Sequence, residues 1–94
     1  MVVFYGIELP SIEEADNQEN PIAHLHFTNG AWHWYVIGAK SYGEDIQFYG
    51  LVNGYDKELG FFNLVEIEKA GARLDEAFKP IGVFDIYPDF DLRN

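Results

Sequence analysis

The sequence predicts an α+β domain, in which a small antiparallel β-meander sheet of about four to six strands carries one or two short helices. Short apolar runs with alternating polar residues recur along the chain, turns rich in glycine and asparagine separate them, and a helix start signal follows the central runs. The length of 94 residues and the apolar content of 48% suit a single domain over residues 1–94.

The N-terminal part is expected to begin with one strand. Residues 2–9 form an aliphatic and aromatic run that stops at Pro10. Residues 11–20 are polar and acidic, so this segment is expected to be either one weak helical turn or a mobile loop, closed by Pro21.

The clearest local signal is a β-hairpin over residues 22–37. Asn29-Gly30 separates two strand-like runs, and this dipeptide favours a two-residue type I′ turn, which needs positive φ at both central positions. Such a turn places His26 directly opposite His33.

Side-chain alternation across this hairpin predicts two different faces. The apolar side chains share a core face, consisting of Ala23, Leu25, Phe27, Trp32, Trp34 and Val36. The opposite face carries His24, His26, His33 and Tyr35.

Four further segments complete the expected meander. Residues 38–45 are expected to be a loop with a turn at Gly43, and residues 46–53 alternate as a strand. A turn at residues 54–57 then leads to a short strand at residues 58–62.

The C-terminal third is expected to contain the helices and a last strand. Asn63 is typical of a helix N-cap, and Glu66 three residues later can complete a capping box. The helix should end near Gly71. Residues 72–78 are expected to continue as a second helical turn, and residues 81–87 as the final strand.

The charge balance excludes several classes of direct partner. Asp and Glu number 16 against 6 Lys and Arg, which gives a formal net charge of -10. Nucleic acid and anionic membrane surfaces attract basic proteins, so neither is expected to bind directly. There are no cysteines for disulfides or thiolate sites, no secretory signal pattern, and no apolar run near the roughly 20 residues of a membrane span. We expect a cytoplasmic protein.

The three histidines form one candidate metal site. His24, His26 and His33 are expected on one face of the hairpin, with neighbouring Cβ atoms about 5–7 Å apart. Three imidazoles with an open fourth position could hold zinc. The competing interpretation is a solvated sheet face that needs no cofactor.

A partner-binding surface is the second candidate site. No lysine or arginine precedes Lys40, so acidic residues in the first part of the chain lack basic neighbours in the sequence. Tyrosines are common interface anchors, whereas the phenylalanines and tryptophans are expected mainly in the core. The expected partner-binding residues are Tyr35, Tyr49, Glu44, Asp45, Asp56 and Glu58.

Three motifs occur in a recognisable order: Trp-His-Trp-Tyr at 32–35, Gly-Glu-Asp-Ile-Gln-Phe-Tyr-Gly-Leu-Val at 43–52, and Glu-Leu-Gly-Phe-Phe-Asn-Leu at 58–64. Together they resemble a family of small bacterial domains of unknown function, common on plasmids, phages and integrative elements. The resemblance covers roughly residues 9–68 and implies a mobile-element setting and the outline of the fold. It carries no catalytic residues. The chain departs from the family pattern at His33, where threonine is usual.

These observations lead to a non-enzymatic acidic binding module of a mobile element. It would occupy the basic surface of a host protein, such as a defence or nucleic-acid-binding protein, by presenting carboxylates in place of phosphates. The alternatives are a metal or small-ligand binding protein that uses the three histidines, and a domain that assembles with itself through an edge strand. An enzyme is not expected, because phosphate loops, nucleophile elbows and metalloprotease motifs are missing from the sequence.

Overall fold

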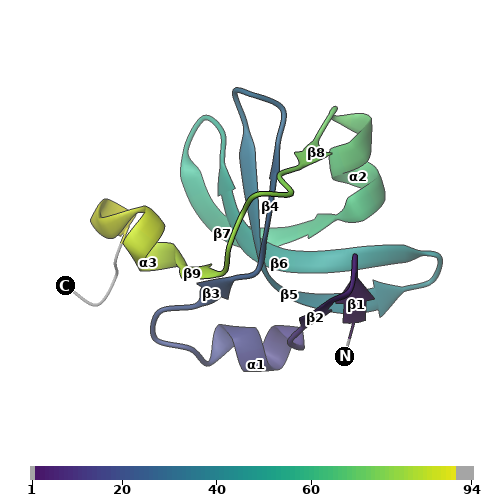
Figure 1. Cartoon of the computed structure of the whole chain (residues 1–94), viewed down its shortest axis with the longest axis horizontal. Helices are drawn as coiled ribbons and strands as arrows, with labels where there is room; N and C mark the ends of the chain where they lie inside the picture. The colour runs from purple at the N-terminus through teal and green to yellow at the C-terminus, as the bar shows by residue number, and fades with distance from the viewer. Residues whose placement is uncertain (1, 91–94) are drawn as a thin grey trace.

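The centre of the fold is a five-stranded antiparallel sheet with the order β7-β6-β5-β4-β8, which confirms the α+β class (Figure 1). The computed structural model describes residues 2–90. Within these residues no helix has both the length and the apolar character needed to cross a membrane. The elements, in chain order, are β1 (Val2–Phe4), β2 (Ile7–Leu9), α1 (Ile12–Asp16), β3 (Ile22–Ala23), β4 (Leu25–Thr28), β5 (His33–Tyr42), β6 (Asp45–Asn53), β7 (Lys57–Asn63), α2 (Leu64–Lys69), β8 (Arg73–Leu74), β9 (Ile81–Gly82), α3 (Val83–Ile86) and the 3₁₀ helix η1 (Pro88–Phe90).

The prediction of one strand over residues 2–9 is wrong, because the segment folds into a hairpin. β1 and β2 pair antiparallel, with Val2 opposite Leu9. Tyr5 and Gly6 both have positive φ, 51° and 76°, as a tight primed turn requires. Glycine adopts this conformation without strain and permits the reversal. The following segment takes the helical alternative: Ser11 caps α1, where its side chain accepts the Glu14 amide.

The β4–β5 hairpin forms, but its register differs from the prediction by two residues. His26 lies opposite Tyr35 rather than His33. The loop is longer because the Thr28 hydroxyl donates to the Trp32 carbonyl at 2.9 Å, and the Asn29 side chain accepts the Trp32 amide at 2.8 Å. Since a shift of two preserves the alternation, the two faces keep their expected residues over β4 and β5.

The prediction of a loop over residues 38–45 is also wrong. β5 continues to Tyr42, and only the turn at Gly43, with φ 63°, interrupts the pairing with β6. A bulge between Val36 and Gly38 shifts the register in the middle of β5. Gly38 is required there, because an added Cβ would lie 2.9 Å from the Cβ of Ala15 on α1.

The capping prediction for α2 is confirmed, whereas the second helical turn is not. The Asn63 amide donates to Glu66 Oε1 at 3.3 Å, and the chain leaves α2 at Gly71, with φ 85°. Residues 73–74 instead form β8, which pairs with β4. The free edge of β4 offers these residues backbone partners that a second helical turn would leave unused.

The last predicted strand, residues 81–87, reduces to the two-residue β9 followed by α3. β9 pairs with β3 in a separate two-stranded sheet. The Asn20 side chain then accepts the Phe84 amide at 3.0 Å and donates to Asp85 at 3.0 Å. This side chain, distant in sequence, satisfies the polar groups of a helix start.

Both faces of the main sheet are covered. One core cluster contains Phe48, Phe27 and Trp34 and packs against β1, β2 and α2. The second contains Tyr35, Ile37 and Leu51 and packs against α1 and α3. The expectation that Ala23 shares the first face is wrong, because it belongs to the second cluster. The chain leaves β3 for the main sheet at His24, which breaks the alternation there.

Candidate functional site

The acidic residues predicted to bind a partner lie at two ends of the sheet. Glu44 and Asp45 are at the β5–β6 turn, whereas Asp56 lies in the β6–β7 turn and Glu58 pairs with Val52 near the other end of β6. β6 has nine residues, so these two pairs are roughly 25 Å apart along the strand direction. The structure therefore does not bring the four carboxylates into one patch.

The prediction that Tyr35 is exposed for partner binding is wrong. Its side chain is only 7% exposed and belongs to the second core cluster. Its hydroxyl lies 3.0 Å from the Tyr87 hydroxyl, which also accepts the Asn53 amide group at 2.9 Å. Burial, together with this hydrogen bond, raises the pKa of Tyr35 far above its ordinary value. Tyr35 is a structural residue under α3 and η1.

Tyr49 is half-buried on β6, and its hydroxyl donates to Asp16 of α1 at 3.2 Å.

Asp45 also has a structural partner, since its Oδ1 accepts the Ile46 amide at 2.7 Å and the Val65 amide at 3.1 Å. Desolvation alone would raise the pKa of Asp45, but these amide hydrogen bonds outweigh it and hold the pKa below its usual range. Asp45 thereby contributes to the start of α2.

The structure brings two of the three histidines together and leaves the third apart. His26 Nε2 lies 2.9 Å from His33 Nδ1. His24 lies instead at the junction of β3 and β4, beside β2 and α1. Residues 2–90 contain no group of three histidine or carboxylate side chains placed to hold one metal ion. Because both ring nitrogens of His26 already have partners, the predicted three-histidine zinc site does not fit this arrangement.

A carboxylate completes a chain of three side chains that the sequence did not indicate. Asp75 Oδ2 lies 2.9 Å from His26 Nδ1. A carboxylate accepts hydrogen bonds only, so Nδ1 of His26 carries the proton at this contact. The hydrogen bond from His26 lowers the pKa of Asp75 below its ordinary value. These hydrogen bonds link Asp75 to His26, and His26 to the half-buried His33.

Aromatic rings hold this chain against the sheet. The His26 ring stacks on Tyr35, with centroids 4.6 Å apart and planes 10° from parallel, and Phe78 closes the other approach at 5.6 Å. The backbone of Asp75 also donates to the His26 carbonyl at 2.8 Å. In the described part of the chain, hydrogen bonds link the two imidazoles to each other and to Asp75, and no serine or threonine hydroxyl bonds to them. The arrangement therefore anchors residues 74–78 to β4.

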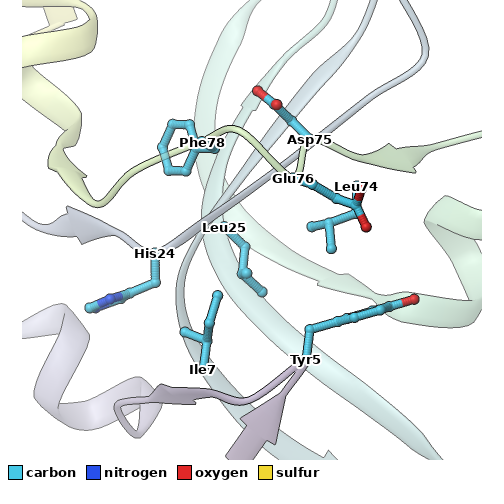
Figure 2. A pocket seen from close by; sticks show the side chains of 8 residues that line it. All are labelled: Tyr5, Ile7, His24, Leu25, Leu74, Asp75, Glu76 and Phe78. Atoms are coloured by element: carbon cyan, nitrogen blue, oxygen red, sulfur yellow. The ribbon is translucent and has the colours of Figure 1, made fainter.

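The anchored segment forms one wall of a surface hollow of about 240 Å³ (Figure 2). The N-terminal hairpin forms the opposite wall, and the start of β4 lies between them. Its lining is mainly apolar and aromatic, with carboxylates on one side: Tyr5, Ile7, His24, Leu25, Leu74, Asp75, Glu76 and Phe78. A second hollow, of about 290 Å³, shares His24 and is lined by Glu8, Leu9, Pro10, Ser11, Glu14 and Gln18.

Sequence reasoning missed this hollow because its walls are distant in the chain. Residues 5–7 and 74–78 meet only through tertiary packing. One local signal was available at Asp75, whose Oδ1 accepts the Ala77 amide at 3.1 Å. Aspartate followed by such a bond two residues later is typical of a turn rather than a helix.

Comparison of the chain with protein-family models, with curated proteins and with solved structures found no match. The resemblance to the mobile-element family therefore stays a prediction. The candidate site rests on its geometry alone: two hollows that share His24, with the Asp75–His26–His33 chain behind one of them.

Because the pKa values of His24 and His33 are lowered, we expect the protein to lose stability on acidification from about pH 7 to pH 5. Burial lowers the pKa of His24, and burial with the neighbouring His26 charge lowers that of His33. Histidines in the unfolded chain have pKa values of about 6.5, so below that pH the unfolded chain binds more protons than the folded protein. The contribution of these two histidines to the free energy of unfolding is therefore fully present above that pH and is lost as the pH falls below it. Urea unfolding at several pH values should show a shallower decline for the His24→Gln/His33→Gln double variant. Equal slopes in the two proteins would contradict this assignment.

Proposed function

We propose that this protein is a non-enzymatic module that binds a partner protein through its acidic surface. The partner presents a basic surface of the kind used for nucleic acid. The resemblance to mobile-element domains supports a host defence protein or another nucleic-acid-binding protein in this role. Carboxylates in place of phosphates would speed association and make binding sensitive to salt.

The observation that carries the proposal is a series of exposed carboxylates that form no ion pair with a lysine or arginine within residues 2–90, although Lys40 lines the same hollow as Glu13. Exposed carboxylates follow one another on β2, on α1 and in the loop after it, and no lysine or arginine occurs before Lys40. Within residues 2–90, Lys57 and Asp89 form the only ion pair between a lysine or arginine and a carboxylate, and it lies near α3. We call the N-terminal group the acidic face; it consists of Glu8, Glu13, Glu14, Asp16 and Glu19.

Removing charge from the acidic face should weaken capture of a basic partner. The experiment is a pull-down from bacterial lysate with the immobilised protein at low and at moderate salt. We expect basic, nucleic-acid-binding proteins to be retained at low salt, released as salt rises, and displaced by added duplex DNA. The variant Glu8→Gln/Glu13→Gln/Glu19→Gln spares Glu14 and Asp16, which have hydrogen-bond partners, and should retain several-fold less of them.

A matched variant distinguishes the effect of the acidic face on partner capture from the effect of the protein's net charge. Glu44→Gln/Asp56→Asn/Glu68→Gln removes the same number of charges from exposed positions at the other turns and on α2, and it includes Glu44 and Asp56, which the sequence predicted to bind the partner. Retention should stay near the level of the unmodified protein. Equal loss in both variants would show that only net charge matters, and no basic partner at low salt would overturn the proposed function.

Self-assembly is the second candidate, supported by one feature of the sheet. β7 is an edge strand of seven residues, and Phe61 on it is 60% exposed. A long edge with an exposed aromatic side chain is a template for pairing with another strand. Light scattering over a concentration range distinguishes the two functions, because the acidic binding module is expected to stay monomeric.

A further inference from the structure

The hollow between the N-terminal hairpin and residues 74–78 combines two kinds of recognition. Its floor and sides are apolar, with Ile7, Leu25 and Leu74 facing the space together with the ring of Tyr5 (Figure 2). At one side stands the exposed carboxylate of Glu76. Neither this hollow nor the neighbouring one has a lysine or arginine in its lining. The site therefore suits a group that is apolar along its length and positive at its end.

The two carboxylates in the first hollow are not equivalent. Both carboxylate oxygens of Asp75 already accept hydrogen bonds: Oδ2 accepts from His26, and Oδ1 accepts from the Ala77 amide. No side chain within residues 2–90 is hydrogen-bonded to the Glu76 carboxylate, which is left to solvent or to a ligand. Because the His26–Asp75 contact fixes the segment, Glu76 is presented from an anchored wall.

The size and the aromatic lining favour arginine as the occupant. A volume of about 240 Å³ lies below the roughly 300–1,000 Å³ typical of cofactor and drug sites, and fits a single long side chain. Tyr5 is 73% exposed at the rim, where its ring contacts Phe4 in a T-shaped arrangement at 4.7 Å and leaves most of its surface for stacking on a ligand. A guanidinium is planar, weakly hydrated and stacks on aromatic rings, whereas an ammonium is compact and strongly hydrated.

The second hollow extends the site beyond a single side chain. His24 lies in the walls of both hollows, and the far side of the second one carries Glu8 and Glu14 of the acidic face. An extended segment that places one basic side chain beside Glu76 can continue past His24 toward these carboxylates. One extended segment of the partner, with basic residues at separate positions, could thus bind in both hollows.

We propose that the hollow lined by Tyr5, Ile7, Leu25, Leu74 and Glu76 receives an arginine side chain of the partner protein, and that the partner segment continues past His24 to the acidic face. This inference rests on the proposed function, since it names the group on the basic partner that the protein recognises. It assigns the specific contact to residues that the acidic face does not include.

The test uses short peptides and NMR. Acetyl-Ala-Arg-Ala-amide is titrated into the full-length protein, with the citrulline and lysine versions as probes of charge and of shape. We expect amide shifts at residues 5–7, 24–25 and 74–78, with the arginine peptide binding tighter than either of the others. Glu76→Gln should weaken the arginine peptide by about threefold to fivefold, the range of one partly exposed ion pair. Glu68→Gln, on α2, should leave its affinity unchanged.

A blocking variant adds an independent readout. Ile7→Lys places a positive charge at the rim of the hollow on the exposed hairpin and should abolish the localised shifts while the melting temperature is preserved. Shifts spread evenly over the acidic surface, or equal affinity for the citrulline peptide, would overturn the arginine site. If salt-sensitive capture of basic proteins persists in that case, the proposed function stands without the site. If capture fails as well, both are rejected.

Discussion

Replacing Phe48 with alanine should lower the free energy of unfolding by about 3–5 kcal/mol. Phe48 lies in the middle of β6, has no exposed surface, and contacts Phe4, Phe27 and Phe62 with ring centroids 5.8–5.9 Å away. Its removal takes away buried apolar area and leaves a cavity between the sheet and the N-terminal hairpin. A domain of this size has a total stability of about 5–15 kcal/mol, so at the lower end of that range the substitution would remove most of it.

The matched control is Phe61→Ala on the neighbouring strand. Phe61 is 60% exposed and contacts Tyr49 at the edge of the second cluster. Its replacement should cost less than about 1 kcal/mol, in the range of surface substitutions. Urea unfolding measures both effects with the same substitution in adjacent strands. Similar losses for the two variants would contradict the assignment of Phe48 to the core and Phe61 to the surface.

Replacing His26 with alanine should have the second largest effect, a loss of about 2–4 kcal/mol of unfolding free energy. His26 is 9% exposed, and within residues 2–90 no other side chain bonds both Asp75 and His33. Its loss leaves a space under Tyr35 and releases residues 74–78 from a side-chain contact to β4. Because the His26 hydrogen bond is the main cause of the lowered pKa of Asp75, that pKa should rise toward its ordinary value.

His24→Ala is the matched control, two residues earlier in the chain. His24 is half-buried in the walls of the two hollows, and no hydrogen bond to its ring is found within residues 2–90. Its replacement should cost less than about 1 kcal/mol and leave the Asp75 titration unchanged. NMR titration of the Asp75 carboxyl in both variants checks the proposed contact directly. An unchanged Asp75 pKa in His26→Ala would contradict it.

The anchoring of residues 74–78 links these stability effects to binding. Asp75 holds the segment by its side chain and its backbone, and Glu76 follows it on the wall of the hollow. His26→Ala should therefore weaken arginine-peptide binding even though His26 is outside the hollow. Glu76→Gln should weaken peptide binding without loss of stability. The two variants together distinguish the effect of anchoring residues 74–78 from the effect of the Glu76 charge.

Local patterns were sufficient where neighbours in sequence are also neighbours in space. The strand at β6, the turn at Gly43 and the Glu66 contact at the start of α2 depend on alternation, on positive φ and on a bond three residues away. The α+β class follows from the same short-range signals. The hairpin at Asn29-Gly30 was predicted as an element, but its loop length was not, because side chains of Thr28 and Asn29 hydrogen-bond within the turn.

The candidate site depended on contacts that no local pattern encodes. Asp75 meets His26 across 49 positions of sequence, and Tyr5 meets Leu74 across the hollow. The burial of Tyr35 has the same origin, because alternation shows which face a side chain occupies but not whether α3 and η1 will cover that face.

From sequence, the charge of -10, the absence of basic residues before Lys40 and the strand-rich α+β class were all accessible, because they depend on composition and on short-range backbone preferences. Only the tertiary structure decided that two histidines and Asp75 join, that His24 stands apart, and that the N-terminal hairpin faces residues 74–78 over a hollow. Those arrangements arise when apolar faces from distant segments are buried together, and the geometry of that burial then selects which polar side chains meet.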